Sequence, residues 1–120
     1  MSYMGKRGEK DNPFEGTFVG RAEFTIGTEA ADAINVIVQL YTGPEVLYAP
    51  GSVTAYLSDN ADGSTLAASA PSGGWVIGTD GLQIPVVTNK AAIYVSENDG
   101  VFDVTITESS AKTFYMATIS

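Results

Sequence analysis

Apolar and polar residues alternate along most of this chain, and short segments rich in Gly, Pro, Asn and Asp interrupt the alternation. A period of two places every second side chain on the same face, which is typical of β-strands with one buried face. The pattern is clearest over 33–41, where Ile34, Val36, Val38 and Leu40 share a face. Further strands are predicted at 17–26, 53–57, 75–77, 82–87, 91–96, 101–107 and 113–119, with a weaker one at 65–69.

The segments that interrupt the pattern have the composition of tight turns. The segments 60–63, 78–81 and 97–100 all end in Asp-Gly, a dipeptide favoured in short hairpin loops. The second and third segments are therefore predicted to join the strands on either side of them as hairpins. Pro85 cannot donate a ladder hydrogen bond, so its strand is expected at a sheet edge or at a bulge.

Eight or nine short strands separated by turns predict an all-β fold, an antiparallel β-sandwich. Immunoglobulin-like and jelly-roll sandwiches share this spacing, so both strand orders stay open. Residues 17–120 are predicted to form this single domain. Residues 1–16 are polar and contain Gly and Pro13, and they are predicted to form a flexible N-terminal arm.

The chain of 120 residues contains no Cys and no His. Disulfides, thiol and imidazole catalysis, and metal sites built on these residues are therefore excluded. No run of about 18 apolar residues exists to span a membrane, and the N-terminus lacks the apolar middle of a signal peptide. The protein is expected to be made in the cytoplasm, and neither a cofactor nor a metal ion is predicted.

The net charge of −8 is unevenly distributed. Four basic residues against three acids give residues 1–21 a charge of +1, whereas two lysines against eleven acids give residues 22–120 a charge of −9. An acidic body repels nucleic acids and anionic membranes, so neither is expected as a partner.

Carboxylates are the chemical groups from which an active site would have to be built. A pair of carboxylates can hydrolyse glycosides. Most acids here stand in predicted turns or at outward strand positions, such as Asp103, which is typical of solvated charge. The sequence therefore predicts that the protein is not an enzyme.

Aspartates in the turns are candidates both for calcium ligands and for parts of a recognition surface. Calcium needs six or more converging oxygens, and the segment 59–63 lacks the alternate ligand spacing of a calcium loop. Turn chemistry is therefore favoured. As an alternative, one end of the sandwich could recognise another surface, with an exposed Trp75 as its anchor, although a Trp at a strand start favours the core. The candidate residues of that end are Asp59, Asp62, Trp75, Asp80 and Asp99.

The arm combines aromatic and basic residues, which suits docking onto another subunit, with simple disorder as the alternative. Its candidate docking residues are Tyr3, Lys6, Arg7, Lys10, Phe14 and Phe18.

Five stretches carry a resemblance to a known group of proteins: VTAYLSDNADGSTLA, the APSGGW turn, IGTDGLQIP, KAAIYVSENDG and DVTITESSAKTFYMATI. Over somewhat more than half of its length, the chain resembles small structural proteins of tailed-bacteriophage virions. The resemblance implies an immunoglobulin-like sandwich and a role as a head or tail accessory protein.

The sharpest expectation is a capsid decoration (cement) protein on the outer surface of the virion head. It would bind the major capsid protein, bridge neighbouring subunits and stabilise the shell. A homo-oligomer is expected, with a trimer favoured because capsid lattices offer three-fold sites. The main alternative is a tail or fibre accessory module that recognises a host surface, and a cryptic hydrolase is a distant third.

Overall fold

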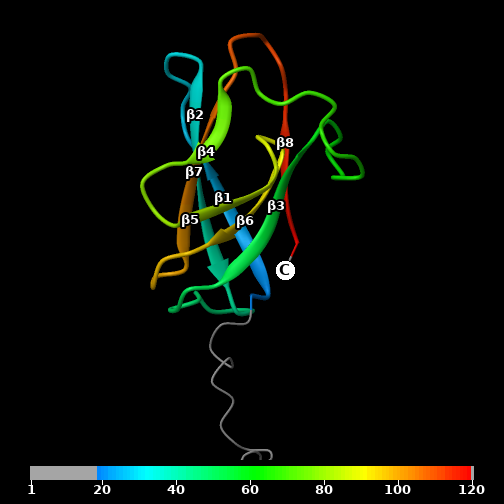
Figure 1. Ribbon diagram of the computed structural model, residues 1–120. Coiled ribbons are helices and arrows are strands. Elements are labelled where there is room, and N and C mark those ends of the chain that lie inside the picture. The colour runs from blue at the N-terminus through cyan, green and yellow to red at the C-terminus, as the bar shows by residue number, and fades with distance from the viewer. Residues whose placement is uncertain (1–18, 120) are drawn as a thin grey trace, which may run out of the picture.

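The computed structural model describes residues 19–119, which form two four-stranded antiparallel sheets packed face to face (Figure 1). The described residues contain no helix, so the predicted all-β sandwich is confirmed. The predicted arm, residues 1–16, lies outside the described residues. The strands are β1 (Arg21–Ile26), β2 (Ala33–Tyr41), β3 (Ser52–Ser58), β4 (Gly74–Ile77), β5 (Leu82–Val87), β6 (Ala91–Val95), β7 (Val101–Thr107) and β8 (Tyr115–Ile119).

Sheet A has the strand order β1-β2-β7-β4, and sheet B has the order β5-β6-β3-β8. Only the β1–β2 and β5–β6 connections stay within a sheet, and the other five cross from one sheet to the other. In the constant-type immunoglobulin fold the second strand lies beside the fifth, whereas β2 here lies beside β7. The strand order therefore departs from the seven-strand constant-type order by the β5–β6 hairpin, which lies between β4 and β7 in the chain. Without that hairpin, sheet A would have the order 1-2-5-4.

The core lies between the sheets and is centred on three aromatic side chains. Tyr94 of β6 and Phe102 of β7 stack across the interface with ring centroids 4.8 Å apart, and Trp75 of β4 meets Tyr94 edge-on at 5.5 Å. All three are buried. Aliphatic side chains that alternate along the central strands surround them, namely Val36, Val38, Leu40, Val53, Ala55, Leu57 and Val104.

The predicted hairpin at 78–81 is wrong, because β4 and β5 belong to different sheets. Beyond Ile77 the chain continues along β7 instead of turning back. Gly78 N–H donates to the Asp103 carbonyl at 2.8 Å, and Asp103 N–H donates to the Asp80 carbonyl at 3.1 Å. The chain then crosses to sheet B as β5.

The turn at 97–100 forms, with Gly100 N–H donating to the Glu97 carbonyl at 2.9 Å, but the hairpin predicted around it is also wrong. β6 belongs to sheet B and β7 to sheet A. The stacking of Tyr94 on Phe102 gives the physical reason, since the two strands lie across the sandwich from each other and bury both rings between the layers.

Two smaller predictions had different outcomes. No strand forms at 65–69, although Ala67 is buried and its N–H donates to the Leu57 carbonyl at 2.8 Å. Pro85 lies on the edge strand β5 beside a bulge between Pro85 and Val87, as predicted.

Candidate interaction surfaces

Sheet B is free of charge on every one of its strands. None of β3, β5, β6 and β8 contains Asp, Glu, Lys or Arg, in a chain whose net charge is −8. Inward-pointing residues such as Val53, Ala55 and Leu57 are buried, so the alternate residues point away from the core. This outer surface, termed the neutral face, is made by Thr54, Tyr56, Leu82, Ile84, Ile93, Val95, Ala117 and Ile119.

One row of side chains crosses the whole neutral face. Ile84 is paired with Ile93, Ile93 with Thr54, and Thr54 with Ile119, so the row passes through all four strands. Ile84 is 45% exposed and Ile119 is 58% exposed. Exposed large apolar side chains gathered on one face indicate an interaction surface, whereas isolated ones do not.

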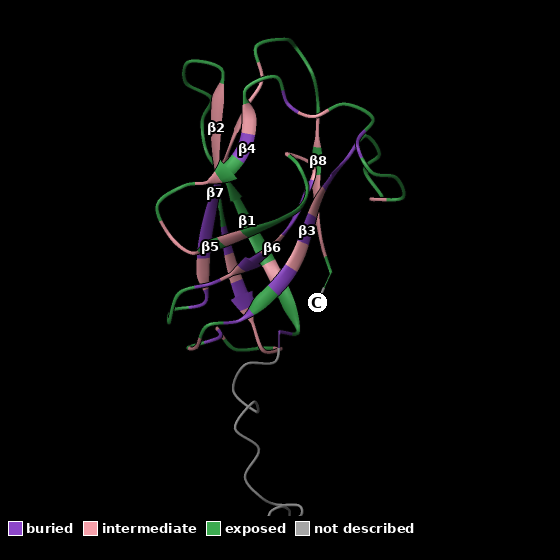
Figure 2. Cartoon of the chain, viewed as in Figure 1, coloured by how far each residue is buried: buried purple, intermediate pink, exposed green. Residues whose placement is uncertain are grey.

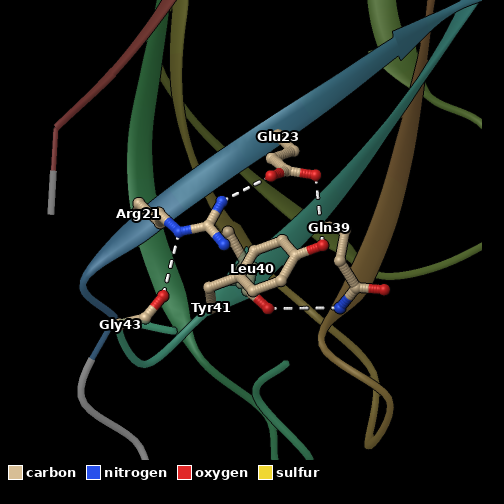
Figure 3. Close-up of polar contacts among 6 residues, drawn as sticks. All are labelled: Arg21, Glu23, Gln39, Leu40, Tyr41 and Gly43. Atoms are coloured by element: carbon tan, nitrogen blue, oxygen red, sulfur yellow. Dashed lines mark hydrogen bonds and ion pairs between the residues drawn. The ribbon is translucent and has the colours of Figure 1, made fainter. Parts of the chain in front are cut away.

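The outer face of sheet A is polar by contrast (Figure 3). The Arg21 guanidinium pairs with Glu23 and lies over the Tyr41 ring, 3.8 Å from its centroid. Tyr41 also donates its hydroxyl to Glu23 Oε1 at 3.1 Å. Hydrogen bonds from Arg21 and then Tyr41 lower the pKa of Glu23, so this group stays charged in water. Sheet A therefore presents an outer face with self-paired charges, on which Ile37 and Val76 are also exposed, whereas the strands of sheet B carry no charge.

Asp103 lies on the outer face of sheet A, but it is only 6% exposed. Its Oδ1 accepts the N–H groups of Thr79 at 2.9 Å and Asp80 at 2.6 Å, and its Oδ2 accepts Asn35 Nδ2 at 2.8 Å. Burial raises the pKa of Asp103, but these hydrogen bonds outweigh it and hold the pKa below its ordinary value. Asp103 thus fastens the 78–81 loop, which corrects its interpretation as a solvated charge.

A groove of ≈ 610 Å³ opens between the sheets and is lined by both β1 and β8, the edge strands on that side. Its apolar lining includes Phe24 and Ile26 of β1, Ile106 of β7, Phe114 just before β8, and Met116 of β8. A cavity of this size is within the range of ligand-binding sites in proteins.

The groove exposes side chains that point toward the interior. Phe24 and Ile26 are paired with Val38 and Val36 of β2, which are buried, and therefore share their face. Yet Ile26 is 71% exposed, and β1 is largely exposed along its length (Figure 2). Of the half-buried strand predicted at 17–26, the described part forms β1 over Arg21–Ile26. β1 is mostly exposed, because no strand among residues 19–119 covers it on the groove side.

The rim of the groove is acidic, with Glu29, Asp32 and Glu108 against Lys112. Glu108 accepts the Ser110 hydroxyl at 2.6 Å and the N–H groups of Ser72 at 2.9 Å and Ser110 at 3.1 Å. These hydrogen bonds, led by the Ser110 hydroxyl, lower the pKa of Glu108 to about 2. Glu108 therefore carries its negative charge at any physiological pH.

The turns predicted to form one recognition end do not gather. β3 and β6 run antiparallel, so the turn after β3 and the turn after β6 lie at opposite ends of sheet B (Figure 1). A third turn, at 78–81, folds against β7. This arrangement separates the candidate residues Asp59 and Asp62 from Asp99. The 78–81 loop, which contains Asp80, adjoins the 97–100 turn, since Leu82 pairs with Val95 and Gly81 N–H donates to Glu97 Oε2 at 3.4 Å.

Trp75 is 1% exposed and lies in the core. Its alternative interpretation as an exposed binding anchor is therefore corrected, and its placement in the core is confirmed. The six docking candidates of the arm lie outside the described residues, namely Tyr3, Lys6, Arg7, Lys10, Phe14 and Phe18.

Residues 19–119 hold no group of three or more acidic side chains placed to share a metal ion. Within the same range, no helix is long and apolar enough to cross a membrane. A comparison with protein-family models, with curated proteins and with solved structures gave no match to this chain. The resemblance to bacteriophage structural proteins therefore stays a prediction.

Sequence analysis missed both the neutral face and the groove. The absence of charge from each strand of sheet B is visible in the sequence, and it was a usable signal. The groove had no such signal, because Phe24 and Ile26 have the alternation of any half-buried strand.

Proposed function

We propose that this protein is a non-enzymatic structural protein that attaches in many copies to a larger assembly through the neutral face. Its sharpest form is the one that the resemblance implies, a capsid decoration protein of a bacteriophage head. In that role it binds the major capsid protein on the outer surface of the shell and bridges neighbouring subunits. The observation that carries the proposal is a whole sheet without charge in a chain of net charge −8.

When an acidic protein binds a partner, water must be removed from the surface that the partner covers. Burying a charge in an interface is costly unless it is paired, so a face without charge is the easiest to cover. Each large aliphatic side chain gains at most about 1.5–3 kcal/mol on full burial, and those of the neutral face are already partly covered. One copy therefore binds weakly. Many copies together stabilise the assembled state, since only that state offers the site.

The rival function, a tail or fibre module that recognises a host surface, loses its proposed anchor and one of its three turns. It depended on Trp75 and three turns acting together. Trp75 is buried, and the turns after β3 and β6 lie at opposite ends of sheet B. The acidic outer loops fit a different role, because like charges keep crowded neighbours apart.

The first experiment is quantitative mass spectrometry of particles purified from the source of this chain, with the major capsid protein as reference. Hundreds of copies in a simple ratio to the capsid protein are expected of a decoration protein. A handful of copies would place the protein in the tail or connector. Absence from particles would overturn the proposal.

A matched pair of substitutions tests the neutral face itself. Ile84 on the neutral face and Ile37 on the outer face of sheet A are both 45% exposed. Ile84→Lys introduces a charge that must be desolvated on docking, so particles should lose this variant on washing. Ile37→Lys should stay bound like the wild type. Equal retention of the two variants would exclude the neutral face as the docking surface.

A further inference from the structure

The groove between the sheets lacks the cover that the rest of the interior has. On the opposite side of the sandwich, where β4 and β5 are the edge strands, Gln83 of β5 donates to the Trp75 carbonyl at 3.2 Å and to the Tyr94 hydroxyl at 2.6 Å. That contact closes the far side. On the groove side, Phe24 and Ile26 remain exposed although they point between the sheets.

The two strands that border the groove also have free edges. β1 is paired only with β2, and β8 only with β3, among residues 19–119. An unpaired edge presents a row of N–H and C=O groups to an incoming strand. An extended segment can pair with such an edge and place alternate side chains in an apolar groove.

Charge and composition point to the N-terminal residues of this chain as the segment that fits. Residues 1–10 contain three basic residues and one acid, and they include Tyr3 and Met4. The rim, with Glu29, Asp32 and Glu108 against Lys112, has a net charge of −2. A basic segment with apolar side chains therefore matches both the rim and the lining of the groove.

The geometry of the arm's origin favours a second copy over the same molecule. Val19 is buried, and Gly20 N–H donates to the Tyr41 carbonyl at 2.7 Å, so the chain enters β1 along the line of that strand. This origin lies at the opposite end of β1 from Ile26, about 24 Å away at the rise of a strand (Figure 1). To enter its own groove, the segment before Val19 would have to turn back along the length of β1, whereas a neighbour's groove requires no such reversal.

We propose that the groove binds the N-terminal segment of a second copy of this chain. Tyr3 and Met4 lie among the apolar lining, and Lys6 and Arg7 lie against the acidic rim. Eighteen extended residues span at most about 60 Å, which is enough to link neighbouring molecules. Such a head-to-tail contact produces a closed ring when the rotation that relates one copy to the next is a whole fraction of a full turn.

Disulfide trapping tests the contact directly, because the chain has no Cys of its own. Full-length Met4→Cys is mixed with isotope-labelled full-length Ile26→Cys, and covalent heterodimers are identified by mass. Docking holds the two thiols at an effective concentration in the mM range, so cross-linking should be at least ~10-fold faster than between Met4→Cys and Ile37→Cys. Ile37 is the control because it is exposed on the outer face of sheet A.

Equal rates at the two sites would overturn the proposal. The double variant Met4→Cys/Ile26→Cys distinguishes the remaining arrangement. If it closes within one chain at every concentration while the mixed single variants give no heterodimer, the arm occupies its own groove and the proposal fails. Ile119→Lys on the neutral face should leave the cross-link unchanged, so this result is independent of the proposed docking function.

Discussion

Asp103 shows how a single buried carboxylate can hold a loop in place. One oxygen accepts two backbone N–H groups of the 78–81 loop, and the other accepts Asn35 Nδ2. In Asp103→Asn the new amide nitrogen would face the Asn35 donor, so a hydrogen bond is lost and a repulsive contact replaces it. We expect a loss of about 1–3 kcal/mol in the free energy of unfolding, measured by urea denaturation.

The same carboxylate should contribute to the acid sensitivity of the fold. The fold lowers the pKa of Asp103, so the ionised carboxylate stabilises the folded state fully above the pKa of an unfolded Asp, near about 3.9. This contribution to the free energy of unfolding is lost as the pH falls through the lower pKa of the folded state. Below about pH 4, the stability of the wild type should therefore approach that of Asp103→Asn. A constant difference between the two proteins down to pH 2 would contradict this assignment.

Trp75 combines a large buried ring with an unpaired polar atom. Its Nε1 has no hydrogen-bond partner among residues 19–119. Trp75→Ala should cost about 3–5 kcal/mol through the cavity that it leaves. Trp75→Phe should cost clearly less, because it removes the unpaired N–H while keeping an aromatic ring beside Tyr94. Urea unfolding followed by circular dichroism ranks the two variants, and equal losses would show that the retained aromatic ring contributes nothing to the free energy of unfolding.

Strands were predictable from the sequence to the extent that alternation reports burial. The bounds of β2, β5 and β7 agree with the predictions, since β2 and β7 have a nearly regular period of two and β5 lies between turn segments at 78–81 and 88–90. The two hairpins were not predictable. An Asp-Gly turn indicates that the chain changes direction, but it carries no information on which sheet receives the next strand. The stacking of Tyr94 on Phe102 decides this for β6 and β7, and it is a contact between layers.

The turn before β7 depends on Gly100. Its φ is +75°, and a Cβ added there would collide with the Leu47 carbonyl oxygen. Gly100→Ala should therefore lower the free energy of unfolding by more than about 1–2 kcal/mol. Gly43→Ala is the matched control, because no atom lies within 4 Å of its added Cβ. Thermal unfolding of the two variants compares them, and similar melting temperatures would show that the turn adapts freely.

At the scale of the molecule, the pairing of strands creates a surface that no single segment reveals. Each uncharged strand of sheet B is unremarkable alone, and only the order β5-β6-β3-β8 gathers them into one neutral face. The candidate recognition end is divided for the same reason, since strand direction places the turn after β3 at the opposite end of sheet B from the turn after β6. The sequence therefore shows that these strands lack charge, but it does not show that they lie side by side in one sheet.

Hydrophobic-interaction chromatography should detect the neutral face in the isolated protein. High sulfate concentrations strengthen apolar contacts and screen the net charge of −8. Ile119→Lys should elute well before the wild type, because it places a charge in the exposed row of the neutral face. Ile37→Lys, on the polar outer face of sheet A, should elute much closer to the wild type. The reverse order would assign the dominant apolar surface to sheet A.

The five connections that cross between the sheets also govern how the chain reaches this fold. Most of its strand pairs join distant parts of the sequence, such as β2 with β7 and β3 with β8. Topologies of this kind refold on a scale of about milliseconds to seconds, and stopped-flow fluorescence of Trp75 can measure this rate. β3 also gains its second neighbour only when 115–119 has been synthesised. A nascent chain on the ribosome therefore carries the uncharged β3 without a partner until β6 has been made, and with one free edge until β8 follows, which leaves β3 open to aggregation over that interval.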